Sequence, residues 1–282
     1  MTMKALSIPS APNSIQKGVP LNLLLDQEAL QCLAGNLSEA YSGFDKDNFI
    51  NDTYKDIGPL SLIERGKHIA TFLKKYLPDN YSKAVEVLLG SLTPPLESTE
   101  NNGLAVFFYL PHVSFVAMYG QDFEYNDGID PFDVSMRAQY ELTKRFSSEF
   151  SIRYFLIKQQ QRTLSVLEKW ATDPDPHVRR LCTEGTRPRL PWAVRIPSFI
   201  KDPSPALPLL EKLKNDDSLY VRRSVANHLG DIAKDHPELV LKICESWLPG
   251  ASDELKWVIR HALRYPAKKG NGKAIDLRKS AG

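Results

Sequence analysis

Two stretches of the sequence decide the fold, LEKWATDPDPHVRR at residues 167–180 and LEKLKNDDSLYVRR at residues 210–223. They align without a gap at a shift of 43 residues, and seven of their fourteen positions are identical. A third, weaker copy runs through residues 257–261, where Val258 takes the place of Val178 and Val221. An internal period of roughly 40–47 residues is typical of proteins built from stacked helix pairs.

Each copy carries a helix start followed by an apolar face. Asp175 and Ser218 stand at equivalent places and are predicted N-caps, and Pro176 suits a first helical turn. Apolar residues then recur at helical spacing, which predicts a buried face of Val221, Val225, Leu229 and Ile232. After residues 235–237 a second helix is predicted, with an apolar stripe of Leu239, Ile243, Trp247 and Leu248. The pattern predicts an all-α fold, a HEAT-like-repeat α-solenoid of stacked antiparallel helix pairs.

The first half of the chain is less regular but shows no alternating strand pattern. Three segments have helical spacing of apolar residues: 21–37, 63–76 and 84–92. Residues 91–103 are a predicted loop. Residues 132–158 lack Pro and Gly, which predicts one long helix or two helices joined by a kink.

The same patterns predict the organisation of the chain. Residues 1–20 are polar and contain Pro and Ser, so we expect a disordered tail there. Residues 21–265 form a single predicted HEAT-like helical domain, with its clearest repeats at residues 160–265. Residues 266–282 are a predicted basic C-terminal tail.

The net charge of +2 conceals an asymmetry between the two halves of the chain. Residues 1–136 carry 9 Lys and Arg against 17 Asp and Glu, a net charge of −8. Residues 137–282 carry 27 Lys and Arg against 17 Asp and Glu, a net charge of +10. This asymmetry indicates that the second half faces a polyanion.

Cysteine usage and hydropathy bound the cellular location. The three cysteines, Cys32, Cys182 and Cys244, are scattered without a CxxC spacing, which argues against a disulfide scaffold and a cysteine zinc site. The apolar run at residues 104–119 is shorter than the roughly 20 residues of a membrane span. The N-terminus has no apolar core of the signal type. We therefore expect a cytoplasmic protein without a membrane partner.

One segment, CTEGTRPRLPWAVRIPSFIKDPSP at residues 182–205, interrupts the repeat. Pro188, Pro191 and Pro197 exclude a regular helix and predict a long loop. The loop interleaves basic and aromatic side chains: Arg187, Arg189, Trp192 and Arg195. Such residues on an irregular segment suit backbone phosphates and an exposed base. Motifs for nucleotide hydrolysis, dinucleotide binding, zinc proteolysis and serine hydrolysis are absent from the sequence.

The segments DPDPHVRR, EGTRPRLPWA and SPALPLLEKLKNDDSLYVRRSVANHLGDIAKDHPELV resemble the AlkC branch of the AlkC/AlkD superfamily of HEAT-like-repeat DNA glycosylases. The similarity is dense from residue 132 to residue 261 and extends loosely to about residue 21. It implies excision of cationic alkylated bases from double-stranded DNA, typically 3-methyladenine, with 3-methylcytosine as a further substrate. Some members carry an immunoglobulin-like domain after the repeats, and none is expected in this chain.

The resemblance implies three catalytic residues, Glu149 in SSEFSIR and Glu184 and Trp192 in EGTRPRLPW. A carboxylate close to C1′ stabilises a sugar that becomes oxocarbenium-like, and Trp192 can lie against a cationic base. No lysine is placed to form a Schiff base. We therefore expect a monofunctional glycosylase that needs no metal or organic cofactor, acts as a monomer and associates with the bacterial nucleoid when bound to DNA.

The arginine doublets at residues 179–180 and 222–223 follow the buried valines. Stacked repeats align such doublets on one surface, beside helix N-termini that favour phosphates. The predicted DNA-binding residues are Arg153, Arg179, Arg180, Arg187, Arg189, Arg222, Arg223 and Arg260. The alternative is that these arginines form ion pairs between repeats, for example with Asp216 or Asp217.

Alternatives also stay open for the catalytic residues and for the whole chain. Glu149 can be a solvated acid, Glu184 can pair with Arg180 or Arg187, and Trp192 can be buried beneath the loop. The chain as a whole can be a DNA-lesion or DNA-structure binding module without activity. It can also be a protein-binding solenoid whose acidic N-terminal half forms the interface.

Overall fold

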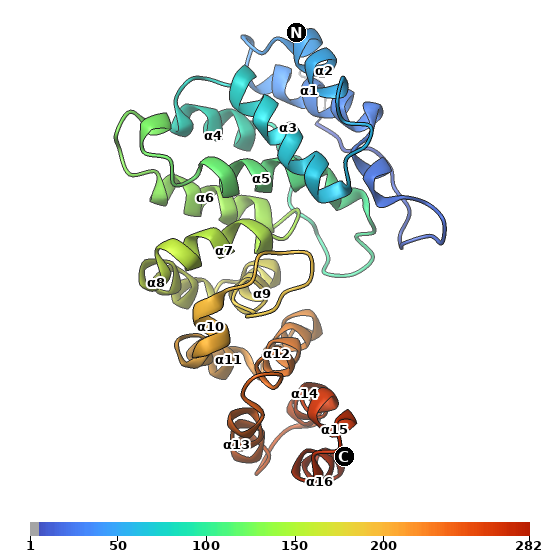
Figure 1. Ribbon diagram of the computed structural model, residues 1–282, viewed down its shortest axis with the longest axis vertical. Helices are drawn as coiled ribbons and strands as arrows, with labels where there is room; N and C mark the ends of the chain where they lie inside the picture. The colour runs from blue at the N-terminus through green and yellow to red at the C-terminus, as the bar shows by residue number, and fades with distance from the viewer. Residues whose placement is uncertain (1–5) are drawn as a thin grey trace. The chain divides into compact units, whose positions relative to one another are not determined.

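The computed structural model describes residues 6–282, and this part of the chain contains helices and no strand (Figure 1). The prediction of an all-α fold is confirmed. The chain divides into two compact units, the first ending at Ser151 and the second running from Ile152 to Gly282. The prediction of a single domain over residues 21–265 stays a prediction.

The first unit is built on helices that bury their apolar faces against one another, α3 on α5 and α4 on α6. Its elements are η1 (Leu21–Leu25), α1 (Gln27–Ala40), α2 (Lys46–Tyr54), α3 (Leu62–Tyr76), α4 (Tyr81–Gly90), η2 (Ala105–Tyr109), α5 (Leu110–Tyr119), η3 (Glu124–Asn126) and α6 (Phe132–Thr143), where η denotes a 3₁₀ helix. The next helix, α7 (Glu149–Lys158), begins in this unit and continues in the second. Residues 132–158 therefore form two helices, as one of the two alternatives predicted.

The apolar run at residues 104–119 forms η2 and the largely buried α5. Among the described residues, no helix has the length and apolarity of a membrane span. Residues 6–20 depart from the predicted disordered tail, because Asn36 donates a 2.8 Å hydrogen bond to the Ser7 carbonyl and the Leu104 N–H donates to the Pro12 carbonyl. The rest of that predicted tail, residues 1–5, lies outside the described residues.

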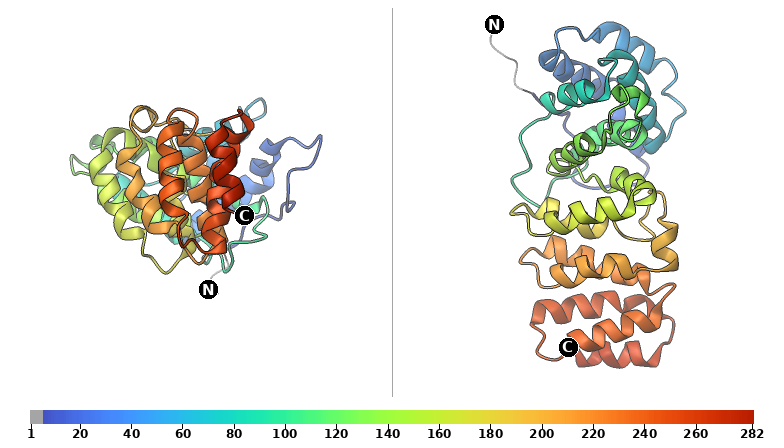
Figure 2. Two further views of the ribbon diagram at one scale, coloured as in Figure 1. Left: turned by 90° about the horizontal axis from the view of Figure 1, so that it is seen from below. Right: turned by 90° about the vertical axis from the view of Figure 1, so that its left-hand side faces the viewer.

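The second unit consists of helices stacked in the order of the chain (Figure 2, right). After α7 they are α8 (Gln160–Trp170), α9 (Pro176–Glu184), α10 (Pro197–Lys201), η4 (Ser204–Ala206), α11 (Leu207–Leu213), α12 (Leu219–Ile232), α13 (Pro237–Trp247), α14 (Asp253–Ala262), α15 (Arg264–Lys268) and α16 (Gly272–Ser280). Helices α9, α12 and α14 stand at equivalent places in successive repeats, and α12 packs against both of the others.

The predicted N-cap residues stand at the starts of α9 and α12, but only the first of them caps its helix through its side chain. Asp175 caps α9 by accepting a 2.8 Å hydrogen bond from the His177 N–H. Ser218 occupies the N-cap position of α12, but its side chain does not cap the helix. The Asp216 carboxylate instead accepts a 2.9 Å bond from the Ser218 N–H. The predicted inner face of α12 is confirmed, since all four of its apolar residues are buried.

One prediction for the end of the chain needs correction. On α13 the apolar side that is buried consists of Val240, Leu241, Cys244 and Trp247, so the predicted stripe was wrong except at Trp247. Most of residues 266–282, the predicted basic tail, form α16, which packs against α13 and α14.

Candidate functional site

The Glu184 carboxylate lies at the C-terminal end of α9, and only 5% of the residue is exposed. Its Oε1 accepts a hydrogen bond from Arg187 Nη1 at 2.6 Å and lies 3.4 Å from Arg180 Nη2. Its Oε2 accepts from the Ser224 hydroxyl at 2.7 Å. Arg187 also donates through Nε to the buried Asp231 at 2.7 Å. Charges of alternating sign therefore lie between α9 and α12, and the pairing of Glu184 that the sequence left open is formed with both arginines.

This environment keeps Glu184 ionised. Burial alone raises the pKa of its carboxyl, but the charges of Arg180 and Arg187, with hydrogen bonds from Ser224 and Arg187, outweigh burial. The pKa of Glu184 therefore lies below its usual value, and the group is negatively charged at neutral pH. A carboxylate of low pKa is a poor proton acceptor, so this environment suits Glu184 to an electrostatic role and not to proton transfer.

Trp192 lies in the predicted loop, which spans residues 185–196 between α9 and α10. The side chain is not buried beneath the loop, because 58% of Trp192 is exposed. Its φ of +63° places it in the left-handed region, which costs a non-glycine residue about 1–3 kcal/mol. The loop closes where the Ile196 N–H donates to the Pro188 carbonyl at 3.2 Å. The loop is shorter than predicted, since Pro197 begins α10.

Arg153 does not lie on a DNA-binding surface, and that prediction is corrected. The residue is fully buried, and its guanidinium donates to four backbone carbonyls of the Trp192 loop, those of residues 185, 187, 188 and 194. The sequence could not reveal this role, because a buried arginine and a surface arginine on a helix look alike in the sequence pattern.

The first arginine of each doublet binds the turn that precedes its own helix, and Arg179 in addition joins two repeats. Nε and Nη2 of Arg179 donate to the two carboxylate oxygens of Asp216 at 2.6 and 3.0 Å, so the inter-repeat ion pair is present here. Its Nη1 donates to the carbonyls of residues 173 and 174 at 2.9 Å each. Arg222 repeats this last contact with the carbonyls of residues 216 and 217. Arg222 also lines a polar hollow of about 610 Å³ between α12 and α14.

The second arginine of each doublet belongs to a row that we name the arginine ladder. It occupies one repeat position on α9, α12 and α14 and consists of Arg180, Arg223 and Arg260. The residue one turn later changes from acidic to neutral to basic along the ladder: Glu184, Asn227 and Arg264. Sequence reasoning missed Asn227 and Arg264, although extending the repeat alignment by four residues finds them.

The ladder becomes less neutralised toward α14. Arg180 pairs with Glu184 and lies over the Tyr220 ring at 4.9 Å. Arg223 is exposed, and no carboxylate within residues 6–282 forms an ion pair with it. Burial first, and then the charges of Arg264 and Arg223, lower the pKa of the neighbouring His261 to about 4. The exposed Arg223 and Arg264, both close enough to His261 to affect its charge, therefore form a cationic surface that can receive an anion.

Most of the remaining predicted site residues are bonded to other groups of the chain or buried. Arg189 forms a 2.7 Å ion pair with Asp235, and Arg260 donates to the Ala281 carbonyl. Arg187 is buried. Glu149 is half-buried at the first residue of α7, in the first unit.

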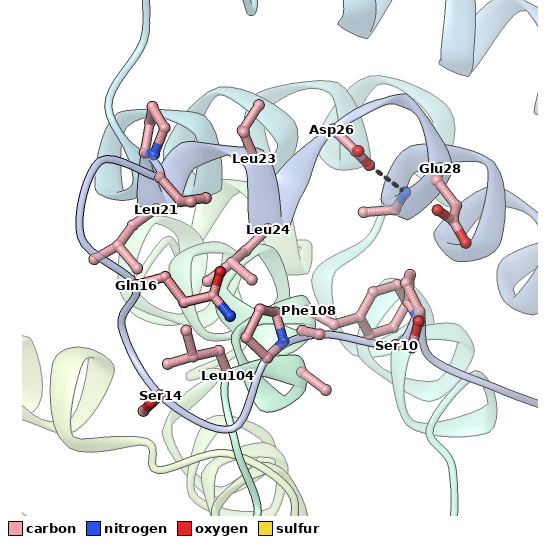
Figure 3. A pocket seen from close by; sticks show the side chains of 17 residues that line it. Ser10, Ser14, Gln16, Leu21, Leu23, Leu24, Asp26, Glu28, Leu104 and Phe108 are labelled. Carbon is pink, nitrogen blue, oxygen red and sulfur yellow. Dashed lines mark hydrogen bonds between the residues drawn. The ribbon is translucent and has the colours of Figure 1, made fainter.

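Figure 3 shows an apolar pocket of about 150 Å³ in the first unit, between η1 and the N-terminal segment. Leu21, Leu24, Leu104 and Phe108 line it, and no predicted site residue does. In the described part of the chain, no three His, Cys, Asp or Glu side chains gather as metal ligands would.

Comparison with known proteins finds relatives of this chain. Residues 146–268 match the family model described as DNA alkylation repair enzyme. The chain is 35% identical over 258 residues to "Uncharacterized protein YhaZ" of Bacillus subtilis (strain 168), with 91% of this chain and 67% of that protein covered. It is also similar to the solved structure of Pseudomonas fluorescens alkylpurine DNA glycosylase AlkC bound to DNA containing an abasic site analog. That match has a TM-score of 0.82 and 37% identity and covers 94% of this chain and 69% of that one.

Proposed function

This chain belongs to the family of DNA alkylation repair enzymes, and on that premise we propose that it is a monofunctional DNA glycosylase. Its substrates are cationic alkylated bases in double-stranded DNA, chiefly 3-methyladenine and in addition 3-methylcytosine. The similarity to the solved AlkC glycosylase supports this proposal. At the site, the observation that carries it is Trp192, an exposed indole held in a strained conformation on a loop attached to the interior.

Cleavage of the N-glycosidic bond of a cationic base needs mainly electrostatic stabilisation from the protein. Alkylation of a ring nitrogen makes the base cationic and a good leaving group, so the protein must chiefly stabilise the deoxyribose as it becomes oxocarbenium-like. The exposed ring of Trp192 can lie against the cationic base, a contact of about 0.5–2 kcal/mol. A neutral base gains less from the ring, which gives selectivity without base-specific hydrogen bonds.

The two acids take different parts in this proposal. Glu184 is already paired, so it holds Arg180 and Arg187 in place and contributes a fixed negative charge. Glu149 stabilises the developing charge on the sugar and orients water. Arg223, the exposed member of the arginine ladder, binds backbone phosphates and supplies affinity that does not depend on sequence.

The test is release of methylated bases from methylated duplex DNA by the purified protein, resolved by chromatography. Wild type is expected to release 3-methyladenine. Glu149→Gln and Glu184→Gln are each expected to lower release at least tenfold, since such electrostatic contributions are worth about 1.4 kcal/mol or more, with DNA affinity nearly unchanged. Glu238→Gln, an exposed acid of α13, is the control and retains full activity.

A structural effect must be separated from a catalytic one at Glu184. Removing its charge takes the Glu184 carboxylate from Arg180 and leaves Arg187 with Asp231 alone, which destabilises a buried ion-pair cluster. Unfolding of each variant is therefore followed at the assay temperature. Unchanged release by a folded Glu184→Gln protein removes Glu184 from the mechanism, and the same result for Glu149→Gln removes Glu149.

The second candidate function is a lesion-binding module without catalysis. The observation that favours it is the complete pairing of Glu184, whose charge is matched by two arginines. Absence of base release by wild type, with DNA binding still measurable, would assign the protein to this class.

A further inference from the structure

The loop that carries Trp192 has few hydrogen bonds of its own, because residues 185–196 contain no regular secondary structure apart from turns. Backbone carbonyls of such a loop have no partners from regular secondary structure, so those that are buried need other hydrogen-bond donors. The side chain of Arg153, from the neighbouring α7, supplies them. Its Nη1 donates to the carbonyls of Gly185 at 3.1 Å and Arg187 at 2.6 Å, its Nη2 lies 3.5 Å from the Pro188 carbonyl, and its Nε donates to Val194.

These contacts tie the two arms of the loop together. Residues 185, 187 and 188 belong to the arm that leaves α9, whereas Val194 belongs to the arm that returns toward α10. Trp192 lies between the two arms, two residues before Val194. A planar guanidinium can reach carbonyls on both arms at once, which the single ammonium of a lysine cannot do.

The close approach of α7 to the loop is built into the sequence at Gly185. A Cβ atom at this position would lie 2.6 Å from Ile152 Cγ2 and 2.9 Å from the Leu181 carbonyl oxygen. Only a glycine allows the backbone to come this near, and Ile152 directly precedes Arg153. The loop and the arginine are therefore held at a fixed separation.

The geometry points to Arg153 as a positioning residue for Trp192. By bonding both arms of the loop, Arg153 keeps Trp192 in its left-handed, solvent-facing conformation, in which the indole can meet a base in DNA. This inference rests on the proposed function for the part that concerns DNA. The part that concerns the conformation of Trp192 stands on the loop contacts alone.

The first unit offers a matched control. Arg65 is also buried, and its guanidinium likewise donates to four backbone carbonyls, those of residues 22, 25, 58 and 60. It therefore has the same structural role as Arg153 with respect to buried carbonyls, but in a segment without Trp192. Arg65→Met controls for the general cost of losing such an arginine.

The experiment is a double-mutant cycle on the rate of base release, with Arg153→Met, Trp192→Ala and the two combined. Arg153→Met is expected to lower the rate at least tenfold, because small misplacements of a contact residue cost up to about a hundredfold. In a protein that already carries Trp192→Ala, adding Arg153→Met should lower the rate of base release by less than a further twofold. Losses that simply multiply would overturn the inference. For the control pair, Arg65→Met and Trp192→Ala, the two fold-losses in the rate of base release should multiply.

A second measurement needs neither DNA nor activity. Acrylamide quenching of Trp192 fluorescence is obtained as the difference between each protein and the same protein with Trp192→Phe. Arg153→Met, or Arg153→Lys if the first variant does not fold, is expected to change the quenching constant of Trp192, whereas Arg65→Met is not. An unchanged constant in the folded Arg153 variant overturns the positioning role. A changed constant in a protein that releases no base supports it while rejecting the proposed glycosylase function.

Discussion

Trp192 has a backbone conformation that its own side chain disfavours. A large residue at φ +63° keeps that conformation only when its surroundings impose it, and here the bonds from Arg153 to both loop arms provide the constraint. Because the indole is exposed, its burial offsets little of the conformational free energy that this backbone conformation costs. Strain that is retained for an exposed ring is typical of a residue kept for contact with a ligand.

This strain predicts an inversion of the usual order of stability between alanine and glycine. Trp192→Gly should be more stable than Trp192→Ala by about 1 kcal/mol, because glycine alone adopts the left-handed conformation without cost. Both variants lose the ring and should lose base release equally. Urea unfolding of the two proteins measures the difference. An alanine variant that is as stable as the glycine variant would show that the loop relaxes and that no strain is stored at this position.

Helices α9 and α12 carry the same Val-Arg-Arg sequence but use its two arginines differently. The first arginine faces inward to the preceding turn and, in Arg179, to Asp216 of the next repeat. The second belongs to the arginine ladder and is exposed at Arg223. The two positions differ by one residue, or about 100° around a helix. That rotation separates an arginine that stabilises the stack from one that can reach a phosphate.

A pair of variants tests this division. Arg223→Ala should weaken binding about equally on damaged and undamaged duplexes and should reduce the slope of log K against log salt by about one. Arg179→Ala should leave the slope unchanged but lower the melting temperature by a few degrees, because it leaves Asp216 without its partner. Filter binding or fluorescence anisotropy over a salt series measures the slopes. A changed slope for Arg179→Ala would place that guanidinium on DNA in spite of its ion pair.

Each of the two units buries a histidine in its core. The ring nitrogens of His112 in α5 have no hydrogen-bond partner among the described residues, and burial lowers its pKa to about 3. In the second unit His228 donates through Nδ1 to the Thr183 carbonyl at 3.0 Å. Burial, followed by the charge of Arg187, lowers the pKa of His228 to about 3. Both rings are therefore neutral in the folded protein at every pH above about 4.

Acid should destabilise the molecule through these two rings. Between pH 6.5 and about 3 the unfolded chain binds a proton at each histidine and the folded chain does not, so stability falls as the pH falls by up to about 1.4 kcal/mol per pH unit for each ring. Above pH 6.5 the rings contribute no pH dependence. His228→Asn preserves a donor to the Thr183 carbonyl and should remove the part of the pH dependence of stability that His228 contributes. Urea unfolding at pH 5 and pH 7 measures it, and an unaltered pH dependence would contradict the buried neutral state.

The same measurement tests whether the two units unfold as one domain. All four tryptophans, at residues 170, 192, 247 and 257, lie in the second unit. Tryptophan fluorescence therefore reports the second unit directly. If residues 21–265 form a single cooperative domain, His112→Asn in the first unit will reduce the pH dependence seen by fluorescence as His228→Asn does. A response to His228→Asn alone would mean that the units unfold separately.

Features that depend on spacing along the chain were predictable from the sequence alone. Apolar residues at helical intervals predicted the inner face of α12, and the capping aspartate predicted the start of α9, because each depends on residues within a few turns of one another. The 43-residue repeat predicted a stack of helix pairs. The partners of the charged groups, in contrast, came from the tertiary structure. Asp216 reaches Arg179 across 37 positions and Asp231 reaches Arg187 across 44, and periodicity cannot select such partners. For the same reason the burial of Arg153 and the strained exposure of Trp192 followed from packing, since a side chain's direction and its loop's closure depend on distant segments of the chain.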